Sequence, residues 1–539
     1  MKKNDVIQIS ITAMSHEGEG IGRHEGMAVF VPMSAIGDEL RVKIVRTLSN
    51  RAYGIIEEIL KPAEARIEND CPHYRVCGGC DLRHITTESE LEIKANMSVE
   101  NMRRIGGIEL EWEAPIDSPQ HSRYRNKAAL PVGLRDRKIV SGFFAKRSHR
   151  LIAMEDCLLQ PEFFGDITRC VCEFCEQYNI APYDEQAHKG VLRHIVIRHA
   201  AKTGEVMVSL VVKGKKLPYS AELVEKLLGV CPAIKTIVLD FNNAKTNVIG
   251  GTKQTVLYGT GSITDELCGV RLGISTGSFY QINRDAAELL YKQALEYAAP
   301  QPDDVLLDLY CGTGSIGLSM AGYVKELIGV EIVPAAVEDA ERNAAENGIS
   351  ARFLCMDAGK AAEVLHREGL KPDIVLLDPP RRGIDAETVE HVSAMQPQRI
   401  VYISCNSATL ARDCAMLLEK GYEVKRGRVV NLFARTSHVE TVVLLSKLKS
   451  TTSIEVKIDL DEMDLTKSES KATYAEIKAY VLEQTGLKVS QLYIAQVKRK
   501  HGIIERENYN TGEGKAKVPQ VPEDKEKAIE GALKYFKMI

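Results

Sequence analysis

Apolar and polar residues alternate along the first 60 residues, and short glycine-containing turns separate the alternating runs. Runs such as "VIQISITAM" and "AYGIIEEIL" have the period of two that is typical of β-strands with one buried face. Residues 1–62 are therefore predicted to form a small β-barrel. The motif "GEGIG" lies between strands and opens no helix, so it is interpreted as a hairpin turn and not as a nucleotide-binding loop.

The strand pattern returns over residues 120–275, with one helical segment expected near residues 160–178. We therefore assign residues 63–270 to a second, β-rich domain. From residue 284 the period changes, and "RDAAELLYKQALEYAA" predicts an amphipathic helix.

Short apolar strands then alternate with helical stretches: "DVLLDLY", "ELIGVEI", "ARFLCMDA", "DIVLLDPP", "RIVYISC" and finally "HVETVVLLSKL". This alternation predicts an α/β fold with a doubly wound parallel sheet in residues 271–449. Such sheets bind ligands beyond the carboxyl ends of their strands.

Residues 450–539 begin with an acidic linker and continue with two predicted helices. The first has a Thr473–Glu476 capping box and a stop at Gly486, and the second starts at Ser490. The pattern is typical of a helical hairpin, with a helix-turn-helix as the alternative. It assigns no role to this extension.

The composition is that of an ordinary globular protein, because 44% of the 539 residues are hydrophobic and the net charge is −4. A nucleic-acid surface would therefore have to be local. Residues 121–150 hold nine Lys or Arg and one acid, interleaved with Tyr124, Phe143 and Phe144. Such a stretch could contact phosphates and unpaired bases, and a solvated hairpin would explain it equally well.

The N-terminus has no secretory signal pattern, and no apolar run approaches the ~20 residues that span a bilayer. We expect a cytoplasmic protein without a membrane partner. Its 13 cysteines would then serve metal binding, catalysis or packing.

The segment "DVLLDLYCGTGSIGL" combines a strand, a glycine-rich turn and a helix start, and Glu331 ends the next strand. Both a nicotinamide cofactor and S-adenosylmethionine fit this pattern. Asp308 before the loop and the rigid Asp378-Pro379-Pro380 turn favour the methyl donor. A nicotinamide-dependent oxidoreductase would leave this turn and Cys405 unexplained.

Cys405 ends a predicted buried strand, "IVYISC". A thiolate that adds to carbon 6 of uracil would make carbon 5 nucleophilic enough to accept a methyl group. The adduct must then lose the proton on carbon 5, and either His438 or Glu440 could accept it.

Five motifs, "FYQIN", "LDLYCGTGSIGL", "LLDPPRRG", "YISCN" and "HVET", occur in the order found in RNA uridine-5-methyltransferases. Residues 1–448 resemble the branch of this family that modifies 23S ribosomal RNA. The resemblance implies a Rossmann-like methyltransferase domain with Cys405 as nucleophile and Glu440 as base. It also implies donor contacts from Gln281, Tyr310, Ser315, Glu331, Asp357 and Asp378. "FYQIN" and "NLFARTSHVE" depart slightly from the usual family pattern.

Cys71, Cys77 and Cys80 have metal-ligand spacing, and the fourth ligand could be Cys157 or one of Cys170, Cys172 and Cys175. By spacing alone, zinc and an iron–sulfur cluster are both possible. The family resemblance implies a 4Fe–4S cluster with Cys157 as last ligand. We expect the cluster to be structural, because the spacing differs from the C-x3-C-x2-C of radical enzymes.

The barrel resembles the TRAM module, an RNA-binding fold similar to the OB-fold. The predicted substrate is a uridine in a single-stranded loop or bulge of 23S ribosomal RNA, and the enzyme is expected to be a monomer. The same reaction on transfer RNA is an alternative, although relatives acting there usually lack barrel and cluster. A non-catalytic RNA-binding or ribosome-assembly protein is the alternative of a different class.

Overall fold

The computed structural model describes residues 1–146, 148–448, 474–487, 489–501, 521–536 and 538–539. The chain forms two compact units, Met1–Lys449 and Ser450–Ile539. Among the described residues, no helix has both the length and the apolar character needed to cross a bilayer.

The N-terminal residues form a closed barrel of five strands in the order β1-β2-β3-β5-β4, as the alternating pattern predicts. The strands are β1 (Val6–Met14), β2 (Glu19–His24), β3 (Met27–Pro32), β4 (Glu39–Thr47) and β5 (Arg51–Lys61). Every second side chain points inward, and the resulting core holds Ile9, Ile11, Val29, Val31, Leu40 and Val42. The "GEGIG" motif spans the end of the β1–β2 turn and β2, which confirms the hairpin interpretation.

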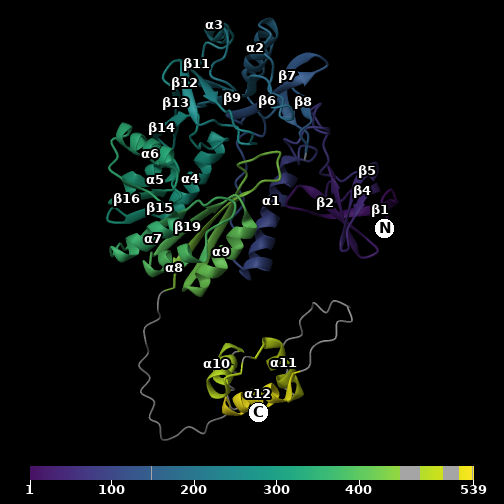
Figure 1. Ribbon diagram of the computed structural model, residues 1–539, viewed down its shortest axis with the longest axis vertical. Coiled ribbons are helices and arrows are strands. Elements are labelled where there is room, and N and C mark those ends of the chain that lie inside the picture. Colours follow the sequence, from purple (N-terminus) through teal and green to yellow (C-terminus); the bar gives the residue numbers. More distant parts are fainter. Residues whose placement is uncertain (147, 449–473, 488, 502–520, 537) are drawn as a thin grey trace. The chain divides into compact units, whose positions relative to one another are not determined.

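A second sheet of seven strands has the order β12-β11-β10-β9-β6-β7-β8 (Figure 1). Its strands are β6 (Lys127–Arg135), β7 (Lys138–Phe144), β8 (Leu151–Ala153), β9 (Leu192–His199), β10 (Val206–Val212), β11 (Ile234–Phe241) and β12 (Lys253–Tyr258). The predicted helical insert is α2 (Phe163–Gln177). A second helix, α3 (Ser220–Val230), is absent from the sequence prediction. It is required because β10 and β11 are parallel, and parallel neighbours need a crossover connection.

A two-stranded ribbon, β13 (Ser262–Leu267) and β14 (Val270–Ser275), leads into the third sheet, whose order is β17-β16-β15-β18-β19-β21-β20. The strands are β15 (Val305–Leu309), β16 (Glu326–Glu331), β17 (Arg352–Cys355), β18 (Ile374–Leu377), β19 (Arg399–Ser404), β20 (Tyr422–Val430) and β21 (Glu440–Lys447). β15 to β19 are parallel, whereas β21 runs antiparallel to both of its neighbours. This is the doubly wound sheet that the sequence predicts.

Helices cover both faces of this sheet, and apolar cores lie on each side of it. They are α4 (Arg284–Ala298), α5 (Ser315–Met320), the 3₁₀ turn η2 (Ala321–Tyr323), α6 (Pro334–Glu346), α7 (Ala358–Arg367), α8 (Ala386–Ala394) and α9 (Ser407–Glu419). An earlier helix, α1 (Thr87–Asn101), continues into a π-helical turn, η1 (Met102–Gly106), and packs on α9 and β20. α1 thus carries the chain onto the third sheet from the segment that contains Cys71, Cys77 and Cys80, which we call the cysteine segment.

In the C-terminal unit, α10 (Tyr474–Thr485) and α11 (Gln491–Lys500) both pack on α12 (Glu523–Tyr535). Ser490 caps α11 by accepting the Tyr493 N–H at 3.2 Å, and Gly486 follows α10 with φ +71°, as predicted. The predicted cap at Thr473 lies outside the described residues. The helices share a core of Ile477, Val481, Ile494, Val497, Ile529 and Leu533.

Candidate active site

Five adjacent parallel strands deliver acidic side chains and one thiol to the same edge of the third sheet. Asp308 lies near the end of β15, Glu331 ends β16, Asp357 follows β17, Asp378 follows β18 and Cys405 follows β19. Because these strands are parallel and in register, their carboxyl ends form one continuous rim. The rim is where a doubly wound sheet binds its ligand.

The glycine-rich loop wraps around Asp308, which is almost fully buried. Its Oδ2 accepts the Gly317 N–H at 3.0 Å, and a Cβ added at Gly317 would lie only 2.7 Å from that oxygen. Oδ1 is buried without a hydrogen-bond partner, and burial raises the pKa of Asp308 to about 8. Gly312 has φ +56°, and a Cβ added there would meet no atom within 4 Å, so a ligand can approach the loop backbone.

Glu331 is held by its own loop, since its two oxygens accept the Gly312 N–H at 3.2 Å and the Val333 N–H at 2.8 Å. A carboxylate keeps further lone pairs for two hydroxyl groups. Beside it, Ile332 is 60% exposed and Val333 is 50% exposed. Exposed apolar residues next to a fixed carboxylate suit an adenosine, so the residues of this rim fit S-adenosylmethionine.

The other predicted donor contacts occupy different environments. Gln281 is buried, and its backbone carbonyl accepts a hydrogen bond from the side-chain amide of Asn126. Tyr310 has φ +67°, a strained conformation for a non-glycine residue. The predicted contacts at Ser315 and Asp357 already have structural partners, because Ser315 Oγ lies 2.8 Å from Tyr291 and Asp357 caps α7.

Cys405 and Glu440 face each other because of the register between β19 and β21. Ser404 pairs with Thr441 in an antiparallel ladder. Cys405, which follows Ser404, therefore lies opposite Glu440, which precedes Thr441. Glu440 is buried, and its Oε2 has no hydrogen-bond partner. Burial, reinforced by the charge of Asp378, raises the pKa of Glu440 well above its ordinary value.

Burial also raises the pKa of the Cys405 thiol to about 11, and the nearby charge of Glu440 contributes. Arg381 opposes both effects, because its positive charge lowers the pKa of Cys405 and that of Glu440. Arg381 is not among the site residues that the sequence predicts. Its signal was present as a cation directly after the Asp378-Pro379-Pro380 turn.

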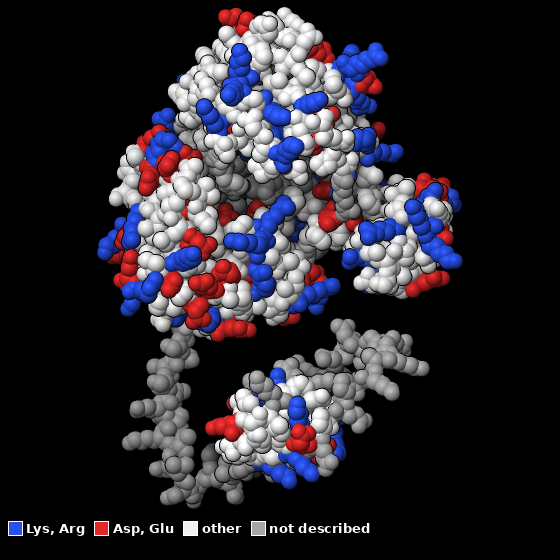
Figure 2. Space-filling model, viewed as in Figure 1, with Lys and Arg blue, Asp and Glu red and all other residues white. Residues whose placement is uncertain are grey.

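A hollow of about 690 Å³ opens beside Cys405. Residues far apart in the chain line it, including His16 after β1, Asp81 after Cys80, Asn101 from α1, Lys146 between β7 and β8, and Arg381 and His438. Figure 2 shows both basic and acidic side chains around the hollowed middle of this unit. The lining carries two cations, Lys146 and Arg381, and two acids, Glu17 and Asp81, so it is the size of the concave surface that suits a strand of nucleic acid.

Cys71, Cys77, Cys80 and Cys157 line one cavity, whereas Cys172 and Cys175 pack in the core of the second sheet and Cys170 packs at its margin. Arg83 and Arg125 line the same cavity, and Arg83 Nη1 and Arg125 Nε are buried there without hydrogen-bond partners. Two orphaned cationic donors beside four thiols fit an anionic thiolate-bound group.

The basic stretch 121–150 forms the β6–β7 hairpin and its flanks. Tyr124 is buried and donates to the Ala434 carbonyl at 2.8 Å, so its ring cannot stack on an RNA base, contrary to the sequence interpretation. Arg123 pairs with Asp156, and Lys146 pairs with Asp81. The turn is made by Asp136 and Arg137, both with positive φ.

Two family models match the chain. The model for tRNA (uracil-5-)-methyltransferases matches residues 241–448, and the TRAM domain model matches residues 2–56.

Proteins similar to this one over most of its length are described as uncharacterized RNA methyltransferases. One from Halalkalibacterium halodurans is 38% identical over 447 residues, which are 83% of this chain and 98% of that protein. Another from Clostridium tetani is 39% identical over 447 residues, which are 83% of this chain and 97% of that protein.

Among solved structures, the chain is similar to the Pyrococcus abyssi tRNA (uracil-54, C5)-methyltransferase in complex with S-adenosyl-L-homocysteine. The two share 26% sequence identity with a TM-score of 0.66, over 81% of this chain and all of that one.

Proposed function

The chain belongs to the RNA (uracil-5-)-methyltransferase family, and from this premise we propose that it methylates carbon 5 of a uridine in 23S ribosomal RNA through a covalent bond between Cys405 and carbon 6. The observation that carries the mechanism is the strand register that sets Cys405 opposite Glu440 at the ligand-binding rim. When bound, S-adenosylmethionine supplies an electrophilic methyl group. Asp308, Glu331 and the loop at Gly312 are the residues that would hold it.

The reaction needs Cys405 as a thiolate. Its addition to carbon 6 moves electron density to carbon 5, which would form the new bond to the methyl carbon as the bond between that carbon and the donor's sulfur breaks and the sulfur keeps the electron pair. Glu440 as a carboxylate then takes the proton from carbon 5, and breaking the carbon 6–sulfur bond returns the thiolate. Arg381 favours the reactive, charged form of both groups.

The mechanism is tested with RNA that contains 5-fluorouridine, because fluorine on carbon 5 blocks the final proton removal. The wild-type enzyme should form a covalent protein–RNA complex in the presence of donor, and Cys405→Ala should form none. Cys355→Ala is the matched control, since Cys355 is an exposed thiol at the end of β17. A complex formed by Cys405→Ala would refute the proposal.

Transfer RNA is the second candidate substrate, because the similar P. abyssi enzyme is described as a tRNA methyltransferase. The similarity to that enzyme covers 81% of this chain, which is more residues than the segment 63–449 contains. The presence of N-terminal domains in this chain therefore does not distinguish a ribosomal RNA substrate from a transfer RNA substrate. Mapping 5-methyluridine by mass spectrometry in 23S ribosomal RNA and in transfer RNA, with and without the gene, decides between them.

The proposal includes a 4Fe–4S cluster held by Cys71, Cys77, Cys80 and Cys157. The four thiols line one cavity together with Arg83 and Arg125, and the unpartnered donors of these two cations support an anionic thiolate-bound cluster at this place. Protein purified without oxygen should be brown and contain iron, and Cys157→Ser should lose iron whereas Cys175→Ser keeps it. Colourless protein with bound zinc would refute the cluster.

A further inference from the structure

An ion pair with no exposed surface lies on α1, between Glu90 and Lys94 one helical turn apart, and it faces the loop that precedes Glu440. Lys94 Nζ donates to Glu90 Oε1 at 2.7 Å, to Asn431 Oδ1 at 2.7 Å and to the Phe433 carbonyl at 3.0 Å. Both charged side chains are 0% exposed. The ammonium group therefore uses all three of its donors, and two of them go to the loop.

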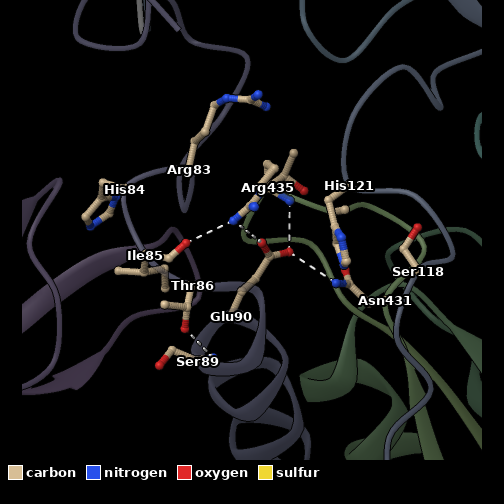
Figure 3. Close-up of polar contacts among 12 residues, drawn as sticks. Arg83, His84, Ile85, Thr86, Ser89, Glu90, Ser118, His121, Asn431 and Arg435 are labelled. Atoms are coloured by element: carbon tan, nitrogen blue, oxygen red, sulfur yellow. Dashed lines mark hydrogen bonds and ion pairs between the residues drawn. The ribbon is translucent and has the colours of Figure 1, made fainter. Parts of the chain in front are cut away.

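We call residues 431–439 the base loop, because they connect β20 to Glu440. Figure 3 shows Glu90 on α1 directed at Asn431 and Arg435 of this loop. Glu90 Oε1 accepts the Arg435 N–H at 2.8 Å, and Arg435 Nη1 donates to the Ile85 carbonyl at 2.9 Å. A single buried carboxylate and a single ammonium thus hold the base loop at several points.

Two further contacts extend this anchoring on either side of the ion pair. Ser98 on α1 lies 2.9 Å from the Thr441 hydroxyl, and Thr441 directly follows Glu440. The Arg435 carbonyl accepts the N–H groups of Asp81 and Leu82, next to the cysteine segment. The backbone that bears Glu440 is therefore held from both directions.

We propose that the Glu90–Lys94 pair is a positioning device for Glu440, which it places through the base loop without touching it. This inference rests on the proposed role of Glu440 as base. Glu440 Oε2 is buried without a hydrogen-bond partner, so the backbone that carries Glu440 helps to fix the position of this oxygen. A buried ion pair is also an inefficient source of stability, whereas its directed hydrogen bonds define geometry.

The test separates the step that needs Cys405 from the step that needs Glu440. Formation of the 5-fluorouridine adduct requires only the thiol and the donor, whereas turnover on uridine requires the base as well. Lys94→Met should lower kcat by about tenfold or more, because displacements near 1 Å carry costs of this size. Its rate of adduct formation should stay within about threefold of the wild-type rate.

Arg399→Met is the matched control. Arg399 begins β19 at the end opposite Cys405, and it pairs with Asp304 at 2.6 Å and with the Ala298 carbonyl. This variant should lower the melting temperature and leave the ratio of turnover to adduct formation unchanged.

Asn431→Ala removes the contact that Lys94 makes to the base loop at 2.7 Å and keeps the ion pair, so it decides the matter if Lys94→Met does not fold. It should show a smaller loss of turnover at an unchanged adduct rate. The proposal would be overturned if either variant lost turnover and adduct formation equally, or kept the wild-type ratio of turnover to adduct formation. Failure of the wild type to form any adduct would refute the proposed function itself.

Discussion

Replacing Asp308 by Asn should stabilise the folded protein relative to the wild type by an amount that grows as the pH rises. Asp308 is buried under the glycine-rich loop with one orphaned oxygen, and burial raises its pKa to about 8, to which the charges of Asp378 and Glu331 contribute. An Asp in an unfolded chain has a pKa of about 3.9. Between these values the unfolded chain binds fewer protons than the folded one, so wild-type stability falls as the pH rises.

The size of the effect follows from the pKa difference. Each pH unit inside this window costs the wild type about 1.4 kcal/mol relative to Asp308→Asn, which has no ionisable group at this site. From pH 5.5 to pH 7.5 the gap should widen by about 2.7 kcal/mol, which appears as a growing difference in melting temperature. Any fixed cost of packing the amide cancels in this comparison.

The assay is thermal unfolding of donor-free protein at several pH values. The matched control is Asp385→Asn, because Asp385 caps α8 by accepting the Thr388 N–H at 2.8 Å, and this hydrogen bond lowers its pKa. Asn caps helices as well as Asp does, so this control should follow the wild type across the window. Parallel pH curves for wild type and Asp308→Asn would show that the carboxyl group is ionised in the fold, and the reasoning would be wrong.

Three predictions concern the proposed catalytic groups. Glu440→Gln should lower the rate of turnover by about 10²–10⁴-fold and let a covalent adduct with ordinary uridine accumulate, which denaturing gels detect. A Glu440→Gln variant that turns over without any adduct contradicts the role of Glu440 as base. Methylation should accelerate from pH 7 to pH 9, because the Cys405 thiol has a pKa of about 11 and must ionise; a plateau below pH 8 in the initial rates refutes this. Arg381→Gln should slow adduct formation at neutral pH and recover the wild-type rate at higher pH, because the charge of Arg381 lowers the pKa of Cys405. Arg381→Lys keeps the charge and should stay close to the wild type. Identical pH profiles for Arg381→Gln and the wild type would exclude this role.

Much of the architecture was predictable because its signals are local. The period of two in the first 60 residues and the alternation of strands and helices after residue 284 both appear in the structure. The prediction missed α3, because a helix of 11 residues between apolar strands leaves a weak periodic signal. Its existence follows from the parallel pairing of β10 and β11, which connects residues distant in the sequence.

The sequence by itself determined the barrel, the doubly wound order and the residue types at the rim, since side-chain periodicity, glycine turns and strand ends depend on neighbouring residues. Only the tertiary structure decided that Cys405 lies opposite Glu440, that Arg381 acts on both, and that Lys94 reaches Asn431 from 337 positions away. These relations depend on strand register and burial, and both arise when segments far apart in the chain pack and exclude water.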